Sequence, residues 1–222
     1  MKPSMDMTRL LLQTMLPLQL IKYLPLVCFL GIVFSVYIHY KRDVHLDEGY
    51  YLVLFETDSK IAPHLRTFNR IKGTRYNHIG LLIRKFPTNR LLHVHPDYRG
   101  THNVISQIDL HTFVANKAKI CEIWQVDVTT YEKQKLQHAL DLLSRCKTIH
   151  YDYAFALDNG NYYCSEFVYV LFKSFDSKKF RFDVSKNKIH YPLNLLYRKD
   201  SIAYIPVDFF KTNPYFSLVK LD

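Results

Sequence analysis

The 222-residue sequence predicts a single α+β domain behind an apolar N-terminal segment. Runs rich in aromatic and β-branched residues alternate with stretches of helical periodicity, which is typical of this class. Near the N-terminus, 18 consecutive residues include no Asp, Glu, Lys or Arg. The composition, 48% hydrophobic and 23% charged, supports a sizeable core and excludes a wholly disordered chain. We therefore divide the sequence into a segment 1–42 and a domain 43–222.

The apolar stretch at residues 23–40 predicts a transmembrane helix. At helical rise it covers about 27 Å, which is close to the thickness of the hydrocarbon core of a bilayer. Tyr residues lie at its two ends, and Lys41 and Arg42 terminate it. No small-x-small cleavage site follows, so we expect an uncleaved single-pass anchor rather than a signal peptide, with a buried core helix as the alternative. Basic residues on both sides leave the side of the membrane open.

The net charge of +10 is spread along the chain. Residues 1–42 hold five Lys or Arg side chains and one Asp, and the rest of the excess is dispersed over the domain. No nucleic-acid-binding signature accompanies it, so no nucleic-acid partner is expected. A basic face toward anionic lipid or an acidic polymer fits equally well, and the lipid bilayer is the partner that the anchor predicts.

The first strands are predicted from apolar runs bounded by turn residues. Residues 49–57 (GYYLVLFET) form one such run. Residues 76–84 and 90–95 form two more, which flank the Pro-Asn turn at 86–89. The short interval between these two runs places them in one antiparallel hairpin.

The rest of the domain alternates between helices and strands. Asp109 is suited to cap a short helix that runs to Asn116, and the alternation over 119–128 predicts a strand. Thr129 and Glu132 form a capping box that starts a longer helix. Its apolar face is expected at Leu136, Ala139, Leu140 and Leu143. A helix or strand is expected at 163–172, a late strand at 201–207 and a late turn at 213–214.

Cys164 is the candidate nucleophile among four cysteines, which are too few for a disulfide framework. It follows a polar loop and opens an apolar segment. At the first turn of a helix, the dipole favours a thiolate, and free backbone N–H groups can bind an oxyanion. The alternative is a buried structural cysteine, which is the reading we adopt for Cys28, Cys121 and Cys146.

Three histidines of the hairpin are candidates for the base and for the residue that orients it. His78 lies among apolar neighbours on the first strand, and His93 and His95 share one face of the return strand. Across a short hairpin, one of the two lies opposite or diagonal to His78. The alternative is a set of polar side chains on a solvated sheet face. A zinc site built from these histidines and Cys164 is a further alternative, although no CxxC or HExxH motif accompanies them.

Two of these segments resemble motifs of known enzymes. Residues 77–82 (NHIGLL) resemble the His-hydrophobic-Gly strand of permuted papain-fold enzymes, and residues 163–168 (YCSEFV) resemble their Cys helix. The histidine precedes the cysteine, as the permuted order requires. Over roughly 49–210 the sequence is similar to the YiiX/YaeF-like cysteine amidases and peptidases. These are relatives of the NlpC-type cell-wall hydrolases and of the lecithin retinol acyltransferase family, whose His-x-x-Pro pattern is matched by residues 93–96.

The resemblance implies a permuted papain-like (NlpC-type) fold, with an antiparallel sheet packed on helices. It implies acyl transfer by Cys164 with His78 as base and His93, or alternatively His95, as the orienting residue. Tyr163 and Glu166 are expected to line the pocket or support the helix, and no cofactor or metal is required. The thiol is expected to be partly accessible, with a lowered pKa.

The expected activity is hydrolysis of a peptide or N-acyl amide bond. The alternatives are an acyltransferase or thioesterase that acts on lipid or acyl substrates, and an inactive membrane-tethered binding module.

Overall fold

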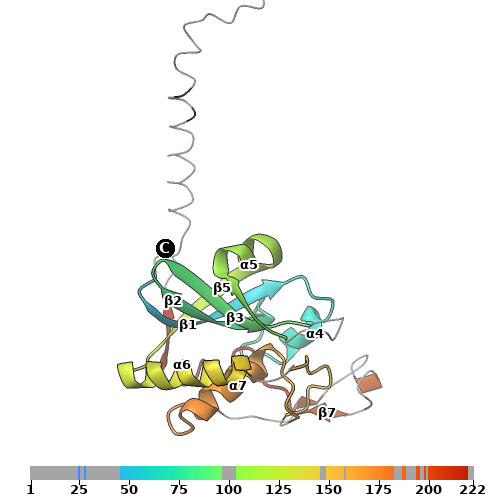
Figure 1. Cartoon of the computed structure of the whole chain (residues 1–222). Helices are drawn as coiled ribbons and strands as arrows, with labels where there is room; N and C mark the ends of the chain where they lie inside the picture. Colours follow the sequence, from blue (N-terminus) through green and yellow to red (C-terminus); the bar gives the residue numbers. More distant parts are fainter. Residues whose placement is uncertain are drawn as a thin grey trace, which may run out of the picture. The chain divides into compact units, whose positions relative to one another are not determined.

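The computed structural model (Figure 1) divides by its contacts into two compact units, Met1–His45 and Leu46–Asp222. The predicted membrane segment, 23–40, lies outside the described residues except for positions 25 and 28. In the part of the chain that is described, no helix has the length and apolar character needed to cross a membrane. The described residues are 25, 28, 46–96, 104–145, 149–157, 159–182, 187–188, 194–195, 198 and 200–219.

The second unit is built on a six-stranded antiparallel sheet with the order β4-β3-β2-β1-β5-β8. The predicted hairpin is confirmed, because β2 and β3 pair from Leu81–Leu92 to Lys85–Thr88. The strands are β1 (Gly49–Thr57), β2 (His78–Lys85), β3 (Thr88–Val94), β4 (Ile105–Asp109), β5 (Ala118–Val126) and β8 (Phe216–Val219).

Helices cover both faces of this sheet, with α5 on one face and α6 and α7 on the other (Figure 1). Leu52 and Leu54 of β1 belong to the large buried cluster that includes the apolar faces of α6 and α7. The next residue, Phe55, points to the opposite face and packs edge-on against Phe113 of α5, with ring centroids 4.8 Å apart. The helices are α4 (Ala62–Thr67), α5 (Leu110–Lys117), α6 (Thr130–Arg145) and α7 (Cys164–Phe175).

Two predicted helix caps are confirmed. The Asp109 carboxylate accepts a hydrogen bond from the backbone N–H of Thr112 at 3.1 Å and starts α5. At α6, the backbone N–H of Thr129 donates to Glu132 at 2.7 Å, and the backbone N–H of Glu132 donates back to the Thr129 hydroxyl at 3.3 Å. This reciprocal pair is the predicted capping box. The segment predicted as a helix or strand at 163–172 is the helix α7.

The C-terminal part departs from the prediction. The late strand expected over 201–207 is limited to β7 (Ser201–Ile202), which pairs with β6 (Asn187–Lys188). The chain then turns through buried residues around Asp208, whose carboxylate accepts the backbone N–H groups of Arg70 and Ile71 at 3.0 and 2.9 Å. At Ile205 of this segment, the backbone N–H donates to the Tyr163 hydroxyl and the carbonyl accepts from the Ser165 hydroxyl, so side chains rather than a strand ladder satisfy it.

Candidate active site

Cys164 is the first residue of α7, and its surroundings differ from those predicted. Its side chain is only 4% exposed and belongs to the large buried cluster. Burial raises the pKa of the thiol to about 11, although hydrogen bonding from the backbone N–H groups of Ile79, Ser165 and Cys164 itself opposes that rise. The expectation of a partly accessible thiol with a lowered pKa is therefore wrong for this structure. The loss of hydration raises the thiol pKa by more than the N–H groups at the helix start lower it.

The same N–H groups define where an oxyanion can be held. The N–H groups at the start of α7 have no carbonyl partner inside the helix. Those of Cys164 and Ser165, together with that of Ile79 on β2, lie close enough to act on the sulfur. Ile79 directly follows His78, so the thiol lies beside the start of the strand that carries the candidate base.

His78 and His93 are joined directly. Nε2 of His78 lies 3.2 Å from Nδ1 of His93, and the two rings meet edge-on with centroids 5.3 Å apart. Phe113 of α5 packs against both rings, at centroid distances of 5.9 and 4.6 Å. The histidine pair therefore lies on the α5 face of the sheet. Cys164 approaches from the start of a helix that packs on the other face.

Cys164 and His78 come near each other at the start of β2, where His78 and Ile79 are consecutive residues. No hydrogen bond joins the Cys164 thiol to His78 among the described residues, and the link between them runs through the His78–Ile79 peptide. With Nε2 occupied by His93, Nδ1 is the nitrogen that His78 has available for a reacting group. Catalytic hydrogen bonds in unliganded enzymes are often long and tighten when substrate binds.

His95 and Gly80 explain why His93 is the partner of His78. Nδ1 of His95 lies 3.0 Å from the carbonyl oxygen of Pro96, and its ring does not take part in the His78–His93 contact. A Cβ atom at Gly80 would lie 2.7 Å from Leu91 Cδ1 and 3.3 Å from His93 Cβ. The glycine in the His-x-Gly pattern therefore makes room for the side chain of Leu91 first, and also for the close approach of His93.

The charge state of His78 follows from its environment. Burial lowers its pKa to about 4, and the charge of nearby His95 acts in the same direction. At neutral pH the ring is uncharged, as a general base must be. The resting pair is thus a neutral imidazole and a protonated thiol.

The loop before Cys164 is held by Asp152, whose role was not predicted. Its buried carboxylate accepts the backbone N–H groups of Ala154 at 2.9 Å and Ala156 at 2.6 Å. Between them, Phe155 has φ of +47°, a left-handed conformation that is strained for an aromatic residue. Its ring packs edge-on against Tyr163, with centroids 5.0 Å apart. The Asp152 turn thus helps to fix the approach to Cys164.

Tyr163 and Glu166 are both buried supports of α7. Tyr163 is 1% exposed, its hydroxyl accepts the backbone N–H of Ile205 at 2.8 Å, and its ring stacks on Tyr204. Glu166 is also 1% exposed, in the first turn of the helix. Within the described residues, no group of three or more His, Cys, Asp or Glu side chains is arranged to hold a metal ion.

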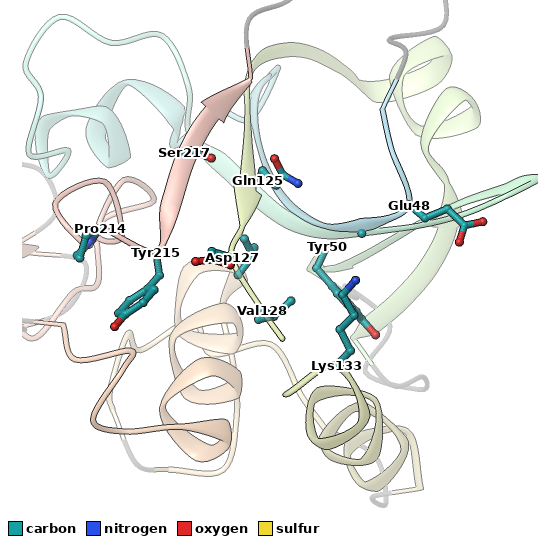
Figure 2. A pocket seen from close by; sticks show the side chains of 11 residues that line it. Glu48, Tyr50, Gln125, Asp127, Val128, Lys133, Pro214, Tyr215 and Ser217 are labelled. Atoms are coloured by element: carbon teal, nitrogen blue, oxygen red, sulfur yellow. The ribbon is translucent and has the colours of Figure 1, made fainter. Parts of the chain in front are cut away.

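A hollow on the surface lies away from these residues (Figure 2). Its volume is about 380 Å³, and it opens between the start of β1, the end of β5, the start of β8 and the first turn of α6. Cys164 and His78 do not line it. Its lining includes Glu48, Tyr50, Gln125, Asp127, Lys133 and Tyr215.

Cys164 opens a helix that packs on an antiparallel sheet, and β2, an earlier strand of that sheet, carries His78. A histidine strand that precedes the cysteine helix is the arrangement of the permuted papain class. The model of one family, described as "permuted papain-like amidase enzyme, YaeF/YiiX, C92 family", matches residues 53–201. The chain belongs to this family. The predicted YiiX/YaeF-like fold and enzyme class are therefore confirmed, whereas the relation to the lecithin retinol acyltransferase family stays a prediction.

The fold also matches a solved structure, that of "metalloprotein yiiX from Escherichia coli O157:H7". The match has a TM-score of 0.56 at 14% identity and covers 79% of this chain and 97% of that chain. At this identity the likeness shows the fold alone. The comparison with curated proteins gave no match.

Proposed function

We propose that the protein is a membrane-anchored cysteine hydrolase that cleaves a peptide or N-acyl amide bond. Cys164 is the nucleophile, His78 the general base and acid, and His93 the residue that orients His78. The observation that carries this proposal is the position of the thiol. It lies among the N–H groups of Cys164, Ser165 and Ile79, and Ile79 directly follows His78, whose ring is bonded to His93.

The reaction follows the logic of other nucleophile–histidine sites. Nδ1 of His78 takes the proton of the thiol while the sulfur attacks the amide carbonyl carbon. The N–H groups around the sulfur stabilise the oxyanion that forms. The imidazolium then gives its proton to the leaving amine, which leaves a thioester on Cys164. Water, deprotonated by His78, releases the acid and restores the thiol.

The test of this function is turnover by the purified chain. N-acyl amides, short peptides and thioesters are offered in turn, with amine or thiol release measured and the acylated Cys164 peptide sought by mass spectrometry. A thioester intermediate on Cys164 and release of an amine support an amidase. Aromatic residues around the thiol, among them Tyr163 in the same buried cluster, also suit an apolar acyl chain. Transfer of that chain to an added alcohol or amine would favour the acyltransferase alternative, and no turnover would favour the inactive binding module.

The choice between His93 and His95 has its own test. His93→Ala should lower kcat by about 10²-fold or more, because His78 then loses the partner that holds its ring. His95→Ala is the matched control, one residue beyond the end of β3, and it should change kcat by only a few-fold. Urea unfolding of both variants checks that they remain folded. A larger loss in His95→Ala than in His93→Ala would transfer the orienting role to His95.

The anchor is the second part of the proposal, and it rests on the uncharged stretch at 23–40. Removal of residues 1–42 should give a folded domain that needs no detergent, because the elements of the sheet and its helices begin at Gly49. The full-length chain should sediment with membranes and resist extraction by alkaline carbonate. Recovery of the full-length chain in the aqueous fraction without detergent would overturn the anchor. A protease-protection assay on sealed vesicles would show on which side of the membrane the domain lies.

A further inference from the structure

Ser106 extends the histidine pair to a third strand. It lies on β4, the edge strand, directly opposite His93 in the β3–β4 register. Its Oγ lies 2.8 Å from Nε2 of His93. Together with the 3.2 Å contact between His93 Nδ1 and His78 Nε2, this makes a continuous chain of polar atoms across β2, β3 and β4. Three neighbouring strands thus each contribute one side chain to a single line.

The direction in which these hydrogen bonds are donated follows from the chemistry of imidazole. A neutral His78 that accepts the thiol proton at Nδ1 must carry its own hydrogen on Nε2. That N–H donates to Nδ1 of His93, so His93 must carry its hydrogen on Nε2. The next group in line is the Ser106 hydroxyl, which must then accept. The reverse direction would leave His78 with hydrogen on Nδ1, where it could not take the thiol proton.

We infer that Ser106 is a positioning residue, whose hydroxyl oxygen accepts from Nε2–H of His93 and thereby holds His78 in the tautomer that serves as base. The inference rests on the proposed function. During the attack, the proton moves only from sulfur to Nδ1 of His78. The hydrogen on Nε2 of His78 and that on Nε2 of His93 stay in place, and the same hydrogen bonds support the imidazolium. His93 is only 3% exposed, so water is poorly placed to substitute for the serine.

Three substitutions of Ser106 distinguish a role as hydrogen-bond acceptor from a role in packing alone. Ser106→Ala removes the acceptor and should lower kcat by about 10- to 100-fold with little change in KM. Ser106→Thr keeps a hydroxyl and should restore most of the activity. Ser106→Asp offers only an acceptor, so it should remain active, and its charge should move the acid limb of the pH profile upward. Gln107→Ala, at the exposed neighbouring position of β4, is the matched control and should behave as the parent.

Imidazole nitrogen shifts in NMR spectra give a readout independent of activity. The full-length chain should show His93 with hydrogen on Nε2, and Ser106→Ala should reduce that population. Hydrogen on Nδ1 of His93 in the parent chain, or an inactive Ser106→Asp that is still folded, would overturn the inference. A parent-like kcat and pH profile in Ser106→Ala would also overturn it. These results leave the proposed function intact as long as turnover still depends on Cys164, whereas loss of that dependence would defeat the proposed function itself.

Discussion

Replacement of Cys164 by Ala should abolish turnover while the domain stays folded. The sulfur is the only atom of this site that forms the covalent intermediate, so kcat should fall by about 10⁴-fold or more. Ala fills most of the buried space, and we expect the free energy of unfolding to drop by about 1 kcal/mol. Turnover is measured with the amide that the parent chain cleaves, and stability by urea unfolding.

Cys121 provides the matched control for this substitution. Its thiol is partly buried on β5 and its pKa is also raised, chiefly by burial, but it lies outside the proposed triad. Cys121→Ala should keep the activity of the parent. If Cys164→Ala instead retained a tenth or more of the parental kcat, the nucleophile would have to be sought elsewhere in the chain.

The rate of alkylation gives a second measure of the same site. With a pKa of about 11, only about one Cys164 thiol in a thousand is ionised at pH 8. Iodoacetamide should therefore label Cys164 slowly at pH 8 and faster as the pH approaches 11. Fast labelling of Cys164 at pH 6–7 would indicate a thiolate–imidazolium pair and contradict the neutral resting pair. Mass spectrometry of the labelled peptides separates Cys164 from Cys121.

The elements that carry the site were predictable because their signals are local. The hairpin that presents His78 and His93 is encoded in two apolar runs and a Pro-Asn turn within 20 residues. The helix start at Cys164 follows from a polar loop before an apolar segment. These features require no knowledge of distant parts of the chain.

The features that were missed depend on distant partners. β4 carries alternating polar residues at a sheet edge, and Ser106 has a role only through its register with His93, 13 residues away. β8 is a short strand whose Trp124–Leu218 pairing joins remote segments. The burial of Cys164 also comes from far along the chain, since Tyr163 beside it is tied to Ile205. Tertiary packing thus reversed the expected pKa of the thiol, which the helix start alone would have lowered.

The second large effect is expected for His78, in the pH dependence of both activity and stability. As the free base, His78 must be uncharged to take the thiol proton, so kcat/KM should fall on the acid side with a pKa near 4 rather than near 6.5. His78→Gln, which cannot transfer a proton, should lower kcat by about 10³-fold or more. The amide can still donate a hydrogen bond toward His93, so the site should keep its shape.

The stability follows from the same lowered pKa. His78 binds a proton near pH 6.5 when unfolded and only near pH 4 when folded, so the unfolded chain holds more protons between these values. The free energy of unfolding should therefore be unaffected by this group above about pH 6.5 and should fall as the pH drops toward 4. Between pH 7.5 and pH 5 the loss attributable to His78 is about 2 kcal/mol.

Comparison with His78→Gln isolates this contribution from the other titrating groups. His93 bonds to His78, and the charge of nearby His95 acts on it. Both residues remain in both chains, as does Cys164, so their effects largely cancel in the difference. Urea unfolding at pH 7.5 and pH 5 should show a larger loss for the parent than for His78→Gln. A thiolate–imidazolium pair in the resting enzyme would raise the pKa of His78 and reverse the sign, so the parent would lose less than the variant. The sign of this difference therefore decides whether the resting site holds a neutral His78 and a protonated thiol. It also decides whether the proton moves before or during the attack on the substrate.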